Sequence, residues 1–255
     1  MCFDLDSRPP IAPIAGGALD SRQLVLTASD ANRFAAFQAH AAEPTGAGII
    51  ILPDVRGLHP YYEELALRFA EAGIDAIAID YFGRTAGAER REGEFEFMPH
   101  VPQTTWAGLR ADITAAAEQL RADGRVRALF TVGFCFGGRV AFLSPTIGIG
   151  FAGAIGFYGS PTGPSRNDTP PPAEVATEMA GAVLGIFGGA DQGITETHVT
   201  AFERALAAAG VEHELVTYPD APHSFFDRKA EDYADDSADA WRRVLDFVRA
   251  RTKSE

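Results

Sequence analysis

The feature that most constrains this fold is a regular alternation of strand-like and helix-like segments. Strand-like segments lie at 48–52, 74–79, 128–133, 152–157, 182–187 and 213–218. Segments of helical period lie at 61–72, 104–122, 196–209 and 233–251, and a further helix begins near residue 136. Strands that alternate with helices form a mostly parallel sheet with helices on both faces. A hairpin over 23–39, turning at 29–32, adds two antiparallel strands, so we expect about eight strands.

A single domain is expected over residues 1–255. Proteins of the α/β class routinely form one domain at this length, and 46% hydrophobic residues can fill a large core without disulfides or metals. Three segments stand outside the alternation, namely an N-terminal extension over 1–20 and loop excursions over 84–103 and 159–178. Long ordered loops often line binding sites. We expect this of the first excursion and place the proline-rich second excursion at the surface.

Charge and cysteine content exclude several classes of function. The net charge of −13 argues against a nucleic-acid partner, because phosphate binding requires clustered Lys and Arg. The segment 1–13 is acidic and proline-punctuated, unlike a signal peptide or a membrane anchor, and no segment reaches the roughly 20 apolar residues of a membrane-spanning helix. Cys2 and Cys135 are too few for a disulfide framework. We therefore expect a soluble, cytoplasmic protein.

The strand at 128–133 runs directly into the sequence GFCFGG, which contains Cys135. This G-x-C-x-G-G pattern matches the G-x-S-x-G nucleophile elbow of the α/β-hydrolase fold, with sulfur in place of oxygen. The glycines are expected because a sharp turn from strand to helix leaves no room for side chains beside the nucleophile. The N-terminus of the next helix would stabilise a thiolate, and the amide of Phe136 could donate to an oxyanion.

A free cysteine at a glycine-rich turn can also be an ordinary buried residue. Two other residues favour catalysis, because the chain order nucleophile, acid, histidine is the order of this fold. Asp191 follows the strand at 182–187, and His223 follows the strand at 213–218. Since the carboxyl ends of parallel strands meet at one edge of the sheet, these three side chains can converge there.

Other candidates for the acid and the base are weaker. Lone histidines in loops, at helix starts or on strands are usually solvated or capping residues, and this describes His40, His59, His100, His198 and His213. Asp220 lies on the same turn as His223, and we interpret it as a turn former. Asp191 is therefore kept as the acid.

Four stretches of the chain are similar to the motifs of one enzyme family. They run from LPDVRGLHPYYEELALRFAEAGIDAIAIDYFGR through GFCFGGR and FGGAD to PHSF, over nearly the whole length. Together they resemble the dienelactone hydrolase family. The resemblance implies a Cys-His-Asp triad without metal or cofactor, a monomer, and a small-molecule ester or lactone as substrate. The type reaction of the family opens the lactone ring of dienelactone.

The resemblance also implies roles for residues outside the triad. In PDVRG, Asp54 stands where the type enzymes carry a glutamate near the thiol, and Val55 would supply the second oxyanion amide. Arg84, in DYFGR, matches an arginine that binds the substrate carboxylate. The family's second such arginine follows the histidine, but HSFFDR places Asp227 there and Arg228 one residue later. The natural substrate therefore stays open.

The sequence predicts a cysteine-dependent hydrolase of esters or lactones that forms a thioester acyl-enzyme. Cys135 would attack the carbonyl, His223 would transfer protons, and Asp191 would orient the imidazole. Because the protein is acidic, an anionic lactone needs a local cation, and we expect Arg84 beside the nucleophile strand to supply it. Two alternatives remain, a general carboxylesterase and a non-enzymatic or redox-sensing protein on a hydrolase scaffold.

Overall fold

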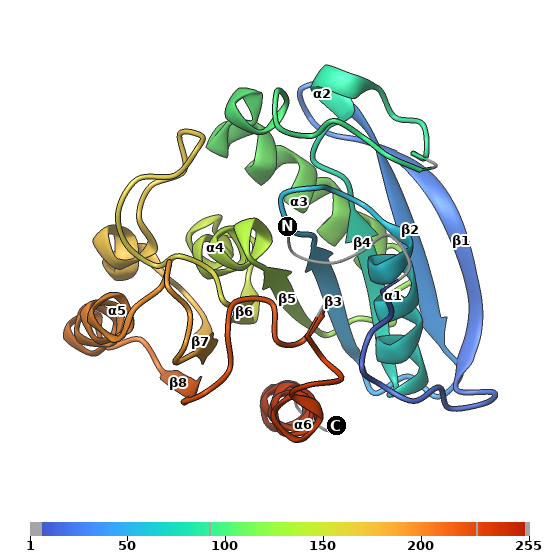
Figure 1. Ribbon diagram of the computed structural model, residues 1–255. Coiled ribbons are helices and arrows are strands. Elements are labelled where there is room, and N and C mark those ends of the chain that lie inside the picture. The colour runs from blue at the N-terminus through green and yellow to red at the C-terminus, as the bar shows by residue number, and fades with distance from the viewer. Residues whose placement is uncertain (1–6, 92, 228, 253–255) are drawn as a thin grey trace.

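An eight-stranded sheet organises the part of the chain that this computed structural model describes, residues 7–91, 93–227 and 229–252. In chain order the strands are β1 (Ala18–Thr27), β2 (Arg33–Ala41), β3 (Ala47–Leu52), β4 (Ile74–Ile79), β5 (Ala128–Phe134), β6 (Phe151–Phe157), β7 (Ala182–Gly188) and β8 (His213–Tyr218). Their order in the sheet is β1-β2-β4-β3-β5-β6-β7-β8 (Figure 1). β2 is antiparallel to both of its neighbours, and all other neighbours are parallel. The predicted sheet of about eight mostly parallel strands is confirmed.

Helices cover both faces of this sheet. They are α1 (Pro60–Glu71), α2 (Gly83–Ala86), α3 (Trp106–Arg121), α4 (Phe136–Leu143), α5 (Glu196–Ala209) and α6 (Ala234–Arg251), with 3-10 segments at Val101–Gln103, Ser144–Thr146 and Pro172–Glu178. Neighbouring residues of β3 point to opposite faces. Ile49 accordingly belongs to a core cluster with α1 and α6, and Ile50 to one with α3 (Figure 1). Because both faces are covered, β3, β4, β5 and β7 are buried throughout.

The segments expected outside the sheet carry more regular structure than predicted. β1 begins at Ala18, inside the predicted extension 1–20, because this residue already pairs with β2. The excursion 84–103 begins within α2 and ends in a 3-10 turn, and the excursion 159–178 also ends in a 3-10 segment. None of the helices in the described ranges is both long and apolar enough to span a membrane.

The carboxyl ends of the parallel strands lie at one edge of the sheet, which is where such sheets bind ligands. β5 ends directly before Cys135, β7 ends shortly before Asp191, and β8 ends shortly before His223. The excursions 84–103 and 159–178 follow β4 and β6 at this same edge. The fold therefore brings Cys135, Asp191, His223 and both long loops to the same edge of the sheet.

Candidate active site

Cys135 occupies a sharp turn between β5 and α4. Its φ of 54° and ψ of −111° are unusual for a residue other than glycine, and such strain persists mainly at functional sites. The turn requires glycine on both sides. A Cβ at Gly133 would lie 1.9 Å from the carbonyl oxygen of Gly137, and one at Gly137 would lie 2.1 Å from the carbonyl oxygen of Leu52. The half-buried Cys135 side chain is thereby presented above the sheet edge.

His223 and Asp191 form a close pair. The His223 Nδ1 lies 2.6 Å from Asp191 Oδ2, while Asp191 Oδ1 accepts hydrogen bonds from the amides of Gly193 and Ile194 at 2.8 and 3.2 Å. Burial by itself raises the pKa of the Asp191 carboxyl, but the bond and charge of His223 and the two amides outweigh it and hold this pKa below its ordinary value. Asp191 is therefore ionised at neutral pH and oriented toward the imidazole.

Cys135 and His223 line one cleft of about 660 Å³ at the carboxyl edge of the sheet. Its walls come from the β3 loop, both excursions, the start of α4 and the loops after β6, β7 and β8, namely Val55, Phe97, Met98, Phe136, Arg139, Tyr158, Ser160, Pro164, Ser165, Arg166, Gly193 and Ile194. Val55 and Phe136, the two expected oxyanion donors, are both among these residues. Phe136 is the first residue of α4, and the first amides of a helix have no partner within it.

Asp54 is fully buried beneath the cleft. Its Oδ1 accepts a hydrogen bond from the Arg56 amide at 2.9 Å, and its own amide donates to the Tyr62 hydroxyl at 2.8 Å. Burial raises the pKa of Tyr81 well above its ordinary range, and the charges of Asp54 and Cys135 both add to this rise. Asp54, Asp80 and Cys135 therefore all lie in the surroundings of the Tyr81 hydroxyl.

Arg84 does not lie beside the nucleophile strand, and that expectation is wrong. It follows β4, which is separated from β5 by β3. Its guanidinium donates to Asp30 Oδ2 at 2.7 Å, to Asp112 Oδ2, and to the Gly108 carbonyl at 3.2 Å. Arg84 is also absent from the described residues that line the cleft. These contacts give it a structural role between α2, α3 and the β1–β2 turn.

Two residues that line the cleft were not singled out from the sequence. Arg139, in the GFCFGGR motif, is buried under the second excursion, and burial lowers its pKa to about 10. The Tyr158 ring packs against the His223 ring at a tilt of 53°, with ring centroids 4.9 Å apart, and its hydroxyl donates to Asp227 Oδ2 at 2.7 Å. Asp227 thus binds a tyrosine at the position where the resemblance implies an arginine. Arg228, the neighbouring candidate, lies outside the described residues.

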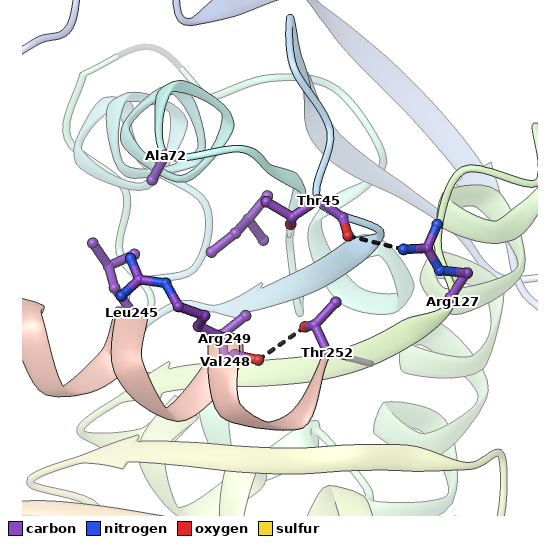
Figure 2. A pocket seen from close by; sticks show the side chains of 8 residues that line it. Thr45, Ala72, Arg127, Leu245, Val248, Arg249 and Thr252 are labelled. Carbon is purple, nitrogen blue, oxygen red and sulfur yellow. Dashed lines mark hydrogen bonds between the residues drawn. The ribbon is translucent and has the colours of Figure 1, made fainter. Parts of the chain in front are cut away.

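A second cavity, of about 460 Å³, lies at the amino ends of β3 and β4 and is bordered by α6. Figure 2 shows its lining, in which Arg127 donates to the Thr45 carbonyl at 3.2 Å and Thr252 donates to the Val248 carbonyl at 2.8 Å. The lining described for this cavity includes no cysteine, histidine or carboxylate. The chemistry-bearing residues are therefore at the opposite edge of the sheet.

Comparison with known proteins gives one consistent result. The sequence model described as "Dienelactone hydrolase family" matches residues 34–252. A protein of Escherichia coli O157:H7 named "Putative carboxymethylenebutenolidase" is 31% identical over 214 residues, which are 79% of this chain and 76% of that protein. A protein of the same name from Methylorubrum extorquens is 29% identical over 83% of this chain and 76% of its own length. The crystal structure of a Klebsiella pneumoniae protein described as "Putative Dienelactone Hydrolase" is similar with a TM-score of 0.76, 26% identity, and coverage of 91% of this chain and 99% of that one.

Proposed function

The chain belongs to the dienelactone hydrolase family, and from this premise we propose that it cleaves esters or lactones with Cys135 as the nucleophile. The observation that carries the proposal is the placement of Cys135 and His223 in one cleft, with His223 bound to Asp191 at 2.6 Å. Cys135 lies on a strained turn at the N-terminus of α4, which is the place that a nucleophile elbow gives to the attacking side chain. Covalent hydrolysis of an ester or lactone uses a nucleophile, a proton carrier and an orienting acid.

The reaction proceeds in two acyl-transfer steps. The Cys135 thiol proton passes to His223, and the resulting thiolate forms a carbon–sulfur bond to the carbonyl carbon. The electron pair of the carbonyl moves to its oxygen, where the amides of Phe136 and Val55 stabilise it. When the intermediate collapses, the carbon–oxygen bond to the leaving group breaks, and His223 supplies a proton to the alcohol or enol. His223 then takes a proton from water, which attacks the thioester and releases the acid and the thiolate. In a lactone the alcohol and the acid remain in one product.

Two carboxylates support these steps in different ways. Asp191 accepts a hydrogen bond from the Nδ1–H group of His223, which leaves Nε2 to exchange protons in the cleft. Asp54 takes the place of the family's glutamate near the thiol. Because aspartate is one methylene shorter, we assign Asp54 an electrostatic influence on Cys135 and no direct contact with it.

The proposal is tested by turnover of a 4-nitrophenyl ester before and after treatment with iodoacetamide. We expect turnover that is lost on alkylation and absent in Cys135→Ala. Full activity after stoichiometric alkylation of Cys135 would reject the cysteine nucleophile. A panel of lactones and esters then separates a lactonase from a general carboxylesterase. If the enzyme turns over no member of the panel, and peroxide oxidises Cys135, the redox-sensing alternative is favoured.

A further inference from the structure

The loop between β3 and α1, residues 53–59, carries Val55, whose amide the proposed function assigns to the oxyanion hole. Val55 lines the same cleft as Cys135. An amide stabilises an oxyanion well only if it is already fixed at the place where the negative charge develops. The contacts that fix this β3–α1 loop therefore bear directly on the reaction.

Asp80, the first residue after β4, binds the backbone of the β3–α1 loop from the side of that strand. Its fully buried carboxylate accepts a hydrogen bond from the Leu58 amide at 3.1 Å through Oδ1 and one from the Phe82 amide at 2.9 Å through Oδ2. The loop passes so close to this carboxylate that a Cβ at Gly57 would lie 2.5 Å from Asp80 Oδ1. The position of the carboxylate therefore sets the position of the loop.

Arg91, in the excursion 84–103, binds the same carboxylate through two parallel hydrogen bonds. Its Nη1 donates to Asp80 Oδ1 at 2.6 Å, and its Nη2 donates to Asp80 Oδ2 at 2.8 Å. The Arg91 side chain is 14% exposed, and its guanidinium lies over the rings of Phe95 and Phe82 at 4.3 and 5.5 Å. A bidentate pair of this kind fixes the orientation of the carboxylate, and removing one partner leaves a buried charge unpaired.

The start of the β3–α1 loop is held by other contacts. The Tyr81 hydroxyl donates to the Pro53 carbonyl at 2.9 Å, and the Asp54 amide donates to the Tyr62 hydroxyl at 2.8 Å. Removing the contact between Arg91 and Asp80 therefore frees the loop on one side only, and we expect the Val55 amide to be displaced while the loop stays folded. A displacement of about 1 Å near the reacting atoms can cost on the order of 100-fold in rate.

We propose that Asp80 and Arg91 are positioning residues, which fix the Val55 amide for the oxyanion and join the β3–α1 loop to the excursion 84–103. Neither residue is among the described residues that line the cleft, so both act through the loop and not on the substrate. The inference rests on the proposed function, because it concerns the same reaction. It assigns the pair to the stabilisation of the oxyanion and leaves the thiolate and the proton transfers unaffected.

Two reactions of Cys135 separate this role from a contribution to stability alone. Hydrolysis of 4-nitrophenyl acetate forms a tetrahedral oxyanion both when the thiolate is acylated and when water attacks the thioester. Alkylation by iodoacetamide forms a carbon–sulfur bond at a saturated carbon and releases iodide, so no oxyanion arises. Both reactions require the same folded protein and the same thiolate. The ratio of their rate constants therefore reports on the oxyanion hole.

Arg91→Ala should lower kcat/KM for 4-nitrophenyl acetate about 10- to 100-fold, up to the loss of a whole oxyanion donor, while the rate constant of alkylation stays within about twofold of wild type. Arg91→Lys keeps the charge without the two parallel bonds and should lose less. Asp80→Asn should show the same pattern as Arg91→Ala, and if it does not fold, the two Arg91 variants decide. Arg90→Ala removes the neighbouring arginine, which pairs with Glu63, and is the matched control that should stay within about twofold in both reactions.

Each other result contradicts the inference. Parallel losses of hydrolysis and alkylation would mean that the pair supports the thiolate or the fold as a whole. Hydrolysis within about twofold of wild type in Arg91→Ala would mean that the loop is held without the pair, and an equal loss in Arg90→Ala would reduce the effect to overall charge. These three results reject the inference alone. If the wild-type protein is alkylated at Cys135 but hydrolyses no ester, the proposed function fails and this inference fails with it.

Discussion

Asp191→Asn removes one charge from the site and almost nothing else. The Asp191 Oδ1 accepts from the amides of Gly193 and Ile194, so an asparagine keeps its oxygen there and turns its NH₂ group toward His223. That group is a donor, and it forces Nδ1 of His223 to become an acceptor. The proton then sits on Nε2, the nitrogen that must exchange protons in the cleft. Asp191→Asn therefore selects the wrong tautomer and removes the charge that stabilises the imidazolium.

The size of the loss follows from the geometry. The Nδ1 to Oδ2 distance is 2.6 Å, and two unit charges about 4 Å apart at an effective dielectric constant of about 20 interact by about 4 kcal/mol. The His223 side chain is 34% exposed and therefore partly screened by solvent, so we expect a loss of about 3 kcal/mol, or about 10²-fold in kcat/KM. His223→Ala should lose at least about tenfold more, because it removes the proton carrier itself.

The assay is steady-state hydrolysis of a 4-nitrophenyl ester at neutral pH by wild type, Asp191→Asn and Asp220→Asn. Asp220 is exposed on the turn before His223, so Asp220→Asn is a matched control and should stay within about twofold of wild type. Near-ultraviolet circular dichroism checks that all three proteins are folded. Wild-type kinetics in Asp191→Asn, or an equal loss in Asp220→Asn, would refute the assignment of the acid.

Three further predictions concern stability. Burial lowers the pKa of His59 from its ordinary value of 6.5 to about 4. Between these two pH values the imidazole is protonated in the unfolded chain and neutral in the folded chain. The free energy of unfolding therefore falls as the pH drops through this window. From about pH 7.5 to 4.5, the free energy of unfolding in urea should fall by about 2–3 kcal/mol less in His59→Gln than in wild type. Equal falls in the two proteins would contradict this prediction. Arg139→Gln should lower the free energy of unfolding by about 2–4 kcal/mol, because it removes the donor that binds the carbonyls of the segment 159–178. The same change should make this segment sensitive to proteases. Unchanged stability and unchanged resistance to proteolysis would show that other contacts hold the loop. Arg84→Ala should lower the free energy of unfolding in urea by about 2–4 kcal/mol, because it leaves the buried Asp112 without its cation. Unchanged stability, together with a loss of turnover confined to carboxylate-bearing esters, would instead support the substrate-binding role expected of Arg84.

The parts of the fold that depend on neighbouring residues were predictable from the sequence. One short segment contains the strand that ends at Phe134, the glycines around Cys135 and the helix that begins at Phe136. Each of these features has its own local sequence pattern. Asp191 and His223 could be placed because each follows a strand whose carboxyl end must reach the same edge. Their convergence therefore followed from topology alone.

The features that depend on distant contacts were not predictable. The position of Arg84 failed because β3 lies between β4 and β5, and the order of strands is not written in any one strand. The contacts of Arg139 join α4 to carbonyl groups 21 to 30 residues away. The Tyr158 to Asp227 bond joins residues 69 positions apart. Such pairs are set by packing, and a single sequence has no periodic signal for them.

The central claim, that Cys135 forms a thioester with the substrate, is tested most directly by trapping the acyl-enzyme. A 4-nitrophenyl ester is mixed with the enzyme, the reaction is quenched in acid within the first turnover, and the intact mass and the peptide masses are measured. We predict that one acyl group is added per chain, that it lies on the peptide containing Cys135, that hydroxylamine removes it, and that it is absent in Cys135→Ala. An acyl group on another residue, or turnover without any adduct and with full activity in Cys135→Ala, would contradict the account.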